Sequence, residues 1–192
     1  MKNNFYDFLE SRQLIHQVTN AKQIKSFLKS KKCVGYIGFD CTSDSLHVGS
    51  LLPLMILRHF QRFGHKPLIL LGGGTTLIGD PSGKDATRKI LSVKEISHNK
   101  KKLKNIFKKF VSFDSKQDNS AILVDNYDWL SNLNLIDFLR QIGSKFSVNK
   151  MVNLESSRLR LQREQNLSFL EFNYMITQAY DYYYLNKNFN CN

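Results

Sequence analysis

The stretch from Tyr36 to Lys84 constrains the fold of this chain more than any other, because it alternates apolar strands with a helix. Val34 to Phe39 and Leu68 to Leu71 are short apolar runs, and both are predicted to be buried strands. Between them, apolar residues recur at roughly helical spacing from Leu46 to Phe60. This order predicts a β-α-β unit with parallel strands and a right-handed crossover, as in doubly wound α/β sheets.

Residues suited to ligand binding follow both predicted strands. His47 and Gly49 are placed in the first turn of the predicted helix, where free N–H groups attract phosphate. The second strand runs into Gly72 to Gly74, a predicted glycine loop, and then into the G-D-P-S-G-K segment from Gly79 to Lys84. These ends are expected to open into one crevice. The segment does not match a P-loop, and each pattern taken alone also fits an ordinary turn.

A third apolar run and a capped helix complete the predicted crevice. Ala121 to Val124 is a third strand, and Asp125 and Asn126 follow it on the crevice side if the strand is parallel. Ser168 and Glu171 form a capping box that opens a helix. Tyr174, Gln178 and Asp181 share one face of this helix and could line a polar pocket, although such a triplet alone also fits a surface stripe.

Composition limits the class of protein. The 192 residues are enough for one domain, and 42% apolar residues are typical of a soluble globular protein. No run of 18 apolar residues predicts a membrane span, and the N-terminus does not resemble a signal peptide. Three cysteines without a C-x-x-C pattern favour a reducing compartment, hence the cytoplasm, and no structural zinc.

Charge is concentrated in one part of the chain. Ten Lys or Arg residues stand between Lys84 and Lys109 against two acids, an excess of eight in a net charge of +12. A basic patch of this size favours nucleic acid as a partner. For Lys100 to Lys109 alone, a solvated helix face is an equal alternative.

Several stretches of this chain follow one another in the order known from one family. They are Gly38-Phe39-Asp40 with Thr42, Asp44 to Gly49, Gly79 to Lys84, Asn126 to Trp129, Phe146 to Asn149, and Ser168 to Asp181. In sequence and order they resemble the bacterial-type tyrosyl-tRNA synthetases, over nearly the whole chain. The resemblance implies an incomplete, Rossmann-like class I synthetase sheet.

The resemblance implies roles around a bound tyrosine. Tyr36 and Asp181 match the pair that hydrogen-bonds the substrate phenol. Asp80, Tyr174 and Gln178 match the residues that hold its ammonium group. Phenylalanine would leave a buried polar pair of this kind unsatisfied, and such a site discriminates by ~10⁴–10⁵.

The resemblance also implies an ATP site and a reaction. The positions that match the ATP side are Asp40, Thr42, His47, Gly49 and Ser50. The tyrosine carboxylate attacks ATP, giving tyrosyl-adenylate and pyrophosphate, and the tyrosyl group passes to tRNA(Tyr). Mg²⁺ is expected with ATP, and no protein-bound metal. The donors expected to stabilise charge on the phosphates are Thr42, His47, Lys84 and Arg88.

The same resemblance divides the chain into three parts. Residues 1–125 are expected to be the nucleotide-binding half, 126–167 a helical connective segment, and 168–192 the helix of the tyrosine pocket. Trp129 to Phe169 is expected to form a homodimer contact. The chain ends at Asn192, before the family's K-M-S-K-S loop and anticodon-binding domains, so we expect only part of the site.

Two residues depart from the family's pattern. Ser50 stands where the H-x-G-H signature has its second histidine, and Cys41 stands where the family usually has proline. Two function classes follow: part of a synthetase catalytic domain that is inactive alone, or a non-catalytic remnant that binds RNA or tyrosine. A tryptophan-specific synthetase is a third possibility, but Tyr36 with Asp181 favours a phenol over an indole.

Overall fold

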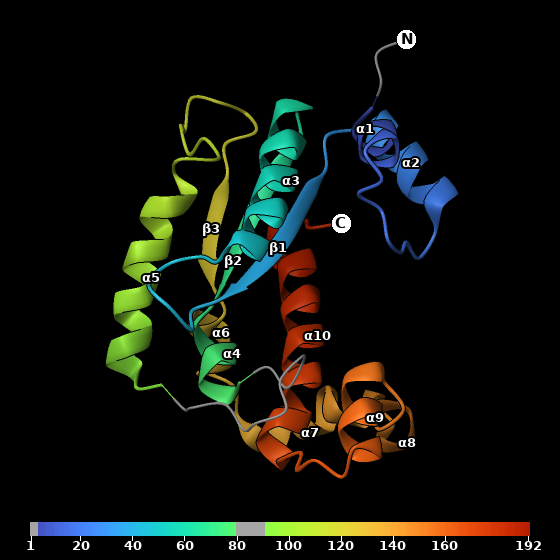
Figure 1. Ribbon diagram of the computed structural model, residues 1–192, viewed down its shortest axis with the longest axis vertical. Helices are drawn as coiled ribbons and strands as arrows, with labels where there is room; N and C mark the ends of the chain where they lie inside the picture. The colour runs from blue at the N-terminus through green and yellow to red at the C-terminus, as the bar shows by residue number, and fades with distance from the viewer. Residues whose placement is uncertain (1–3, 80–90) are drawn as a thin grey trace.

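A parallel sheet forms the centre of the computed structural model, which describes residues 4–79 and 91–192 (Figure 1). Within these ranges the strands are β1 (Val34–Asp40), β2 (Lys66–Gly72) and β3 (Ile122–Asp125), in the order β1-β2-β3. Both pairings are parallel, with Tyr36 opposite Leu68 and Leu68 opposite Ile122. The predicted parallel α/β sheet is therefore confirmed.

Helices surround this sheet and make up most of the second half of the chain. Most of those between β3 and the last helix are short. In chain order, the α-helices of the described residues are α1 (Phe5–Ser11), α2 (Ala21–Ser30), α3 (Leu51–Arg62), α4 (Gly73–Ile78), α5 (Val93–Phe107), α6 (Tyr127–Leu130), α7 (Leu135–Gln141), α8 (Val148–Met151), α9 (Glu155–Gln162) and α10 (Phe169–Phe189).

The two faces of the sheet carry different helices, as expected for a doubly wound fold (Figure 1). Ile69 and Leu71 of β2 pack with residues of α3 and α5, including Leu103, in one core cluster. Leu68 and Leu70 point to the other face, because successive strand residues alternate, and they pack with α6 and α10. Both faces of β2 are therefore buried, which explains its continuous apolar sequence.

Helix α10 is fixed at both ends, and this positions its polar face. Its first turn contains the predicted capping box, in which Ser168 and Glu171 each accept a hydrogen bond from the other's backbone N–H. The helix ends at Asn190 in the left-handed conformation. Asn192 then donates its backbone N–H to the carbonyl of Val34 at 3.0 Å, which ties the end of the helix to β1.

Two predicted details are wrong. The helix after β1 does not begin at His47, which is extended; a single 3-10 turn (Val48–Ser50) precedes α3. The glycines after β2 do not form a loop, because Gly73 and Gly74 begin α4. A Cβ on Gly73 would lie 2.2 Å from a carboxylate oxygen of Asp125, so glycine allows α4 to start against the end of β3.

In the described part of the chain, no helix is long and apolar enough to cross a bilayer.

Candidate active site

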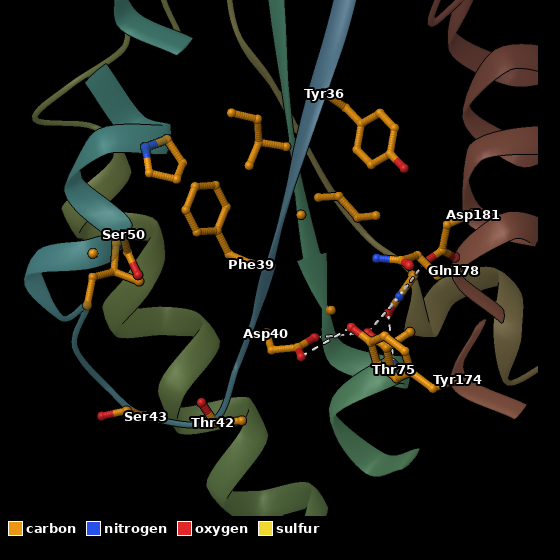
Figure 2. Close-up of a pocket in the computed structure, with 18 of the residues that line it drawn as sticks. Tyr36, Phe39, Asp40, Thr42, Ser43, Ser50, Thr75, Tyr174, Gln178 and Asp181 are labelled. Atoms are coloured by element: carbon orange, nitrogen blue, oxygen red, sulfur yellow. Dashed lines mark hydrogen bonds between the residues drawn. The ribbon is translucent and has the colours of Figure 1, made fainter. Parts of the chain in front are cut away.

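A cleft of about 960 Å³ opens at the carboxyl ends of β1 and β2 (Figure 2). Parallel α/β sheets bind ligands at this position. One side of the cleft is formed by the segment between β1 and α3, and the other side by α10. The predicted site residues that line it are Tyr36, Asp40, Thr42, His47, Gly49, Ser50, Tyr174, Gln178 and Asp181. The other three predicted residues, Asp80, Lys84 and Arg88, lie outside the described residues.

Asp181 is the carboxylate at the α10 side of the cleft, and it is only 2% exposed. One of its oxygens accepts a hydrogen bond from Nδ2 of Asn126 and the other from Nε1 of Trp129, both at 2.8 Å. Burial raises the pKa of Asp181 to about 6, although these two hydrogen bonds lower it and the charge of Asp40 raises it further. The side chain is therefore held in one orientation and titrates near neutral pH.

Tyr36 lies across the cleft from Asp181, on β1 (Figure 2). Its ring packs at 6.2 Å from that of Tyr182 on α10. Burial, and then the charge of Asp181, raise the pKa of Tyr36 to about 12, so its phenol stays neutral at physiological pH. A neutral hydroxyl and a buried carboxylate thus share one end of the cleft.

Asp40, at the end of β1, lies in the middle of the cleft. One of its carboxylate oxygens accepts a hydrogen bond from the hydroxyl of Thr75 at 3.2 Å, and the other from the hydroxyl of Tyr174 at 3.3 Å. A Cβ on Gly72 would lie 2.4 Å from this carboxylate, so glycine is needed there. The resemblance implies the ATP side for Asp40, and the hydrogen bond from Tyr174 shows that Asp40 also lies next to α10.

The opposite end of the cleft is formed by exposed polar residues that follow β1. The hydroxyl of Ser50 lies 3.4 Å from Nε2 of His47, and the N–H of Ser50 donates to the His47 carbonyl at 2.9 Å. A Cβ on Gly49 would meet the His47 ring at 2.8 Å. These residues, with Thr42, offer several donors to an anion.

Sequence reasoning did not assign a site role to Asn126 and Trp129, which hold Asp181. Asn126 is fully buried, and its carbonyl oxygen accepts from the backbone N–H groups of Gly74 at 2.7 Å and Thr75 at 3.4 Å. Its amide donates to Thr75 as well as to Asp181, so every donor and acceptor of the side chain is used. The position of Asn126 directly after the third strand, on the crevice side, could have indicated such a role.

No group of three or more His, Cys, Asp or Glu side chains that could hold a metal ion occurs in residues 4–79 and 91–192.

Comparison with known proteins identifies the family. A family model described as tRNA synthetases class I (W and Y) matches residues 28–191. The chain belongs to this family of class I tRNA synthetases. The cleft therefore corresponds in position to the ligand crevice of a doubly wound synthetase sheet.

Within this family, the chain is similar to individual tyrosine–tRNA ligases. The chain is 51% identical over 191 residues to the Wolbachia pipientis tyrosine–tRNA ligase and 56% identical over 193 residues to that of Ehrlichia chaffeensis. It covers 45% and 46% of those proteins, so it spans less than half of their length. A C-terminally truncated mitochondrial tyrosyl-tRNA synthetase of Aspergillus nidulans matches with a TM-score of 0.86 and 29% identity, over 97% of this chain and 55% of that one.

The buried carboxylate leads to a prediction about stability. The pKa of Asp181 is about 6 in the folded protein, above its ordinary value of 3.8, so folding favours the protonated form. This contribution to stability is complete below about pH 4 and is lost as the pH rises through about 6. We expect the free energy of unfolding of the wild type to fall relative to that of Asp181→Asn between pH 4 and pH 7.

Urea denaturation at several pH values measures this difference. The matched control is Asp128→Asn, because Asp128 is an exposed carboxylate on α6. Its difference from the wild type should stay nearly constant over the same range. A constant difference for Asp181→Asn would contradict the raised pKa.

Proposed function

We propose that this chain is the tyrosine-activating part of a tyrosine–tRNA ligase. Such an enzyme joins tyrosine to ATP, releases pyrophosphate, and transfers the tyrosyl group to tRNA(Tyr). The observation that carries the proposal is the buried Asp181 carboxylate, held by Asn126 and Trp129 opposite the neutral phenol of Tyr36. The relatives named tyrosine–tRNA ligase support it.

The proposed pocket recognises tyrosine through its hydroxyl group. A carboxylate accepts up to about four hydrogen bonds, so Asp181 can accept one from the substrate besides those from Asn126 and Trp129. The phenol of Tyr36 can donate a hydrogen bond to the substrate oxygen. Phenylalanine would supply no partner for the phenol of Tyr36 and no third hydrogen bond to Asp181, which costs binding free energy.

The middle of the cleft would hold the ammonium group of the amino acid. Asp40 supplies negative charge there, and Tyr174 and Gln178 supply oxygen acceptors from α10. These acceptors would place the substrate carboxylate toward the exposed polar end of the cleft. The carboxylate itself is the nucleophile, so the protein needs to supply no general base.

The exposed end of the cleft would hold ATP. The side chains of Thr42, His47 and Ser50 are donors there, and Gly49 leaves the backbone open to the nucleotide. These donors would orient the α-phosphorus for in-line attack and stabilise charge on the leaving pyrophosphate. Mg²⁺ carried by the ATP phosphates would neutralise part of the same charge. Lys84 and Arg88, outside the described residues, are proposed to act on the pyrophosphate.

We also propose that the enzyme works in the cytoplasm as a homodimer. Large apolar side chains are exposed between Trp129 and Phe169, including Leu135 (66%), Ile136 (62%), Val148 (61%) and Phe169 itself (81%). Exposed apolar groups of this size are typical of interfaces.

Specificity for the hydroxyl group is the first test of this function. We expect isothermal titration to show binding of tyrosine and much weaker binding of phenylalanine. Tyr36→Phe should weaken tyrosine binding by ~3–10-fold, the usual effect of losing one hydrogen bond. Tyr183→Phe is the matched control, because Tyr183 is an exposed tyrosine of α10 that does not line the cleft. Equal binding of the two amino acids would refute the proposed specificity.

Association is tested by sedimentation. We expect the wild-type chain to form dimers, and we expect Phe169→Asp to shift them to monomers, since it places a charge in an apolar contact. Val93→Asp is the control, because Val93 is also an exposed apolar residue but lies on α5. A wild type that stays monomeric at high concentration would contradict the homodimer.

Activity is tested by tyrosine-dependent exchange of pyrophosphate into ATP. These 192 residues span 45–46% of the relatives' length, so we expect them alone to be ~10²-fold or more slower than the full Ehrlichia chaffeensis enzyme. Adding the remaining part of that relative should restore exchange, and His47→Ala should abolish the restored rate. Rapid exchange by the chain alone would refute the need for a second part. No exchange in either sample would favour the non-catalytic alternative.

A further inference from the structure

Helix α5 carries a row of lysines on the side that faces away from the core. Its apolar residues Ile96, Leu103 and Phe107 are buried in the cluster that covers the sheet. The exposed lysines of the helix and of the turn that follows it are Lys94, Lys101, Lys102, Lys104, Lys108 and Lys109. None of them lines the cleft. We call these six residues the α5 lysine face.

The charge of this face is not neutralised within the described residues. None of its six lysines forms an ion pair there, whereas Lys100, on the same helix, is partly buried and pairs with Asp125. Neighbouring lysines such as Lys101 and Lys104, or Lys104 and Lys108, are three or four residues apart, and like charges at this spacing destabilise a helix. Helix stability therefore does not explain the face, although Lys104 and Lys108 interact favourably with the helix dipole.

The face forms a line along one flank of the molecule. α5 stands at the outer edge of the helix layer, next to β3 (Figure 1). Lys94, Lys101 and Lys108 are seven residues apart and therefore lie on one stripe, which extends for about 21 Å at 1.5 Å per residue. The helix begins at the end of the sheet where the cleft lies and runs away from it (Figure 1).

The chemistry of the face favours one kind of partner. A membrane-surface helix needs an exposed apolar side, but the apolar side of α5 is buried in the core. Protein interfaces are depleted in lysine at their centre and enriched in Tyr, Trp and Phe, and the exposed side of α5 has none of these three. A row of unpaired lysines matches the regularly spaced phosphates of a nucleic acid.

We propose that the α5 lysine face binds the phosphodiester backbone of RNA, through charge and without reading base sequence. This deepens the proposed function, because it assigns a surface to the RNA partner of that enzyme. The binding of an RNA backbone is argued from the lysines alone, and only the identity of the RNA as tRNA rests on the proposed function. The face contacts phosphates along the flank, while the cleft holds the small substrates.

The test measures binding of a fluorescein-labelled RNA hairpin by anisotropy over a range of salt concentrations. The variant is Lys94→Gln with Lys101→Gln and Lys108→Gln. We expect its affinity at low salt to fall by ~10–100-fold, and the slope of log affinity against log salt to decrease by about 2–3, one unit for each lost phosphate contact. Circular dichroism confirms folding, since glutamine is nearly as good a helix former as lysine.

The matched control removes three exposed lysines elsewhere, with Lys22→Gln and Lys29→Gln on α2 and Lys187→Gln on α10. It has the same net charge as the α5 variant, and its RNA affinity should stay within ~3-fold of the wild type. Equal losses in the two variants would show that only net charge matters and would overturn the proposal. Stronger α5-dependent binding to phosphatidylserine vesicles or to polyglutamate than to the hairpin would also overturn it.

Titration of both variants with tyrosine separates this proposal from the proposed function. α5-dependent RNA binding without tyrosine binding would support the surface and count against the ligase. Tyrosine binding with RNA affinity that does not depend on the α5 lysines would support the ligase and overturn the surface.

Discussion

The hydrogen bonds of Asn126 hold together three parts of the cleft that are distant in sequence. Its carbonyl oxygen accepts from the first turn of α4, its amide donates to Asp181 of α10, and its own backbone N–H donates to the carbonyl of Leu71 on β2. Buried polar groups must be paired, so a change in any of these elements would leave an unpaired group. The position of the Asp181 carboxylate therefore depends on one amide at the end of β3.

Burial disfavours the ionised form of Asp181, and the same burial is what the proposed recognition of a hydroxyl group depends on. Removing Asp181 from water raises its pKa to about 6, and Asn126 and Trp129 recover only part of the lost hydration. Both partners are donors, so they favour the ionised form, which can only accept. A substrate hydroxyl adds a third donor, whereas an apolar ring adds none. In the proposed tyrosine pocket, the burial that makes this charge costly would therefore favour a ligand with a hydroxyl group.

The sequence predicted the features that depend on local pattern. Apolar runs indicated the three strands of the described residues, and the Ser168 and Glu171 capping box indicated the start of α10. It did not predict that Gly73 begins a helix, because the reason is the approach of Asp125, which is more than fifty residues away. For the same reason, Asn126 could be placed at the crevice but its contact with Asp181 could not. The resemblance to a family indicated which residues line the cleft, and the hydrogen bonds of the structure explain how Asp40 and Asp181 are held there.

Successive side chains of β2 point to opposite faces of the sheet, and this separates the two proposed binding surfaces. Leu68 and Leu70 pack against the layer that contains α10 and the proposed tyrosine pocket. Ile69 and Leu71 pack against the layer that contains α3 and α5. The lysines of α5 and the polar residues of α10 share no hydrogen bond or ion pair in the described residues. Distant sites without shared partners contribute additively. The proposed RNA-binding flank and the proposed amino-acid pocket can therefore occupy opposite faces of one sheet without disturbing each other.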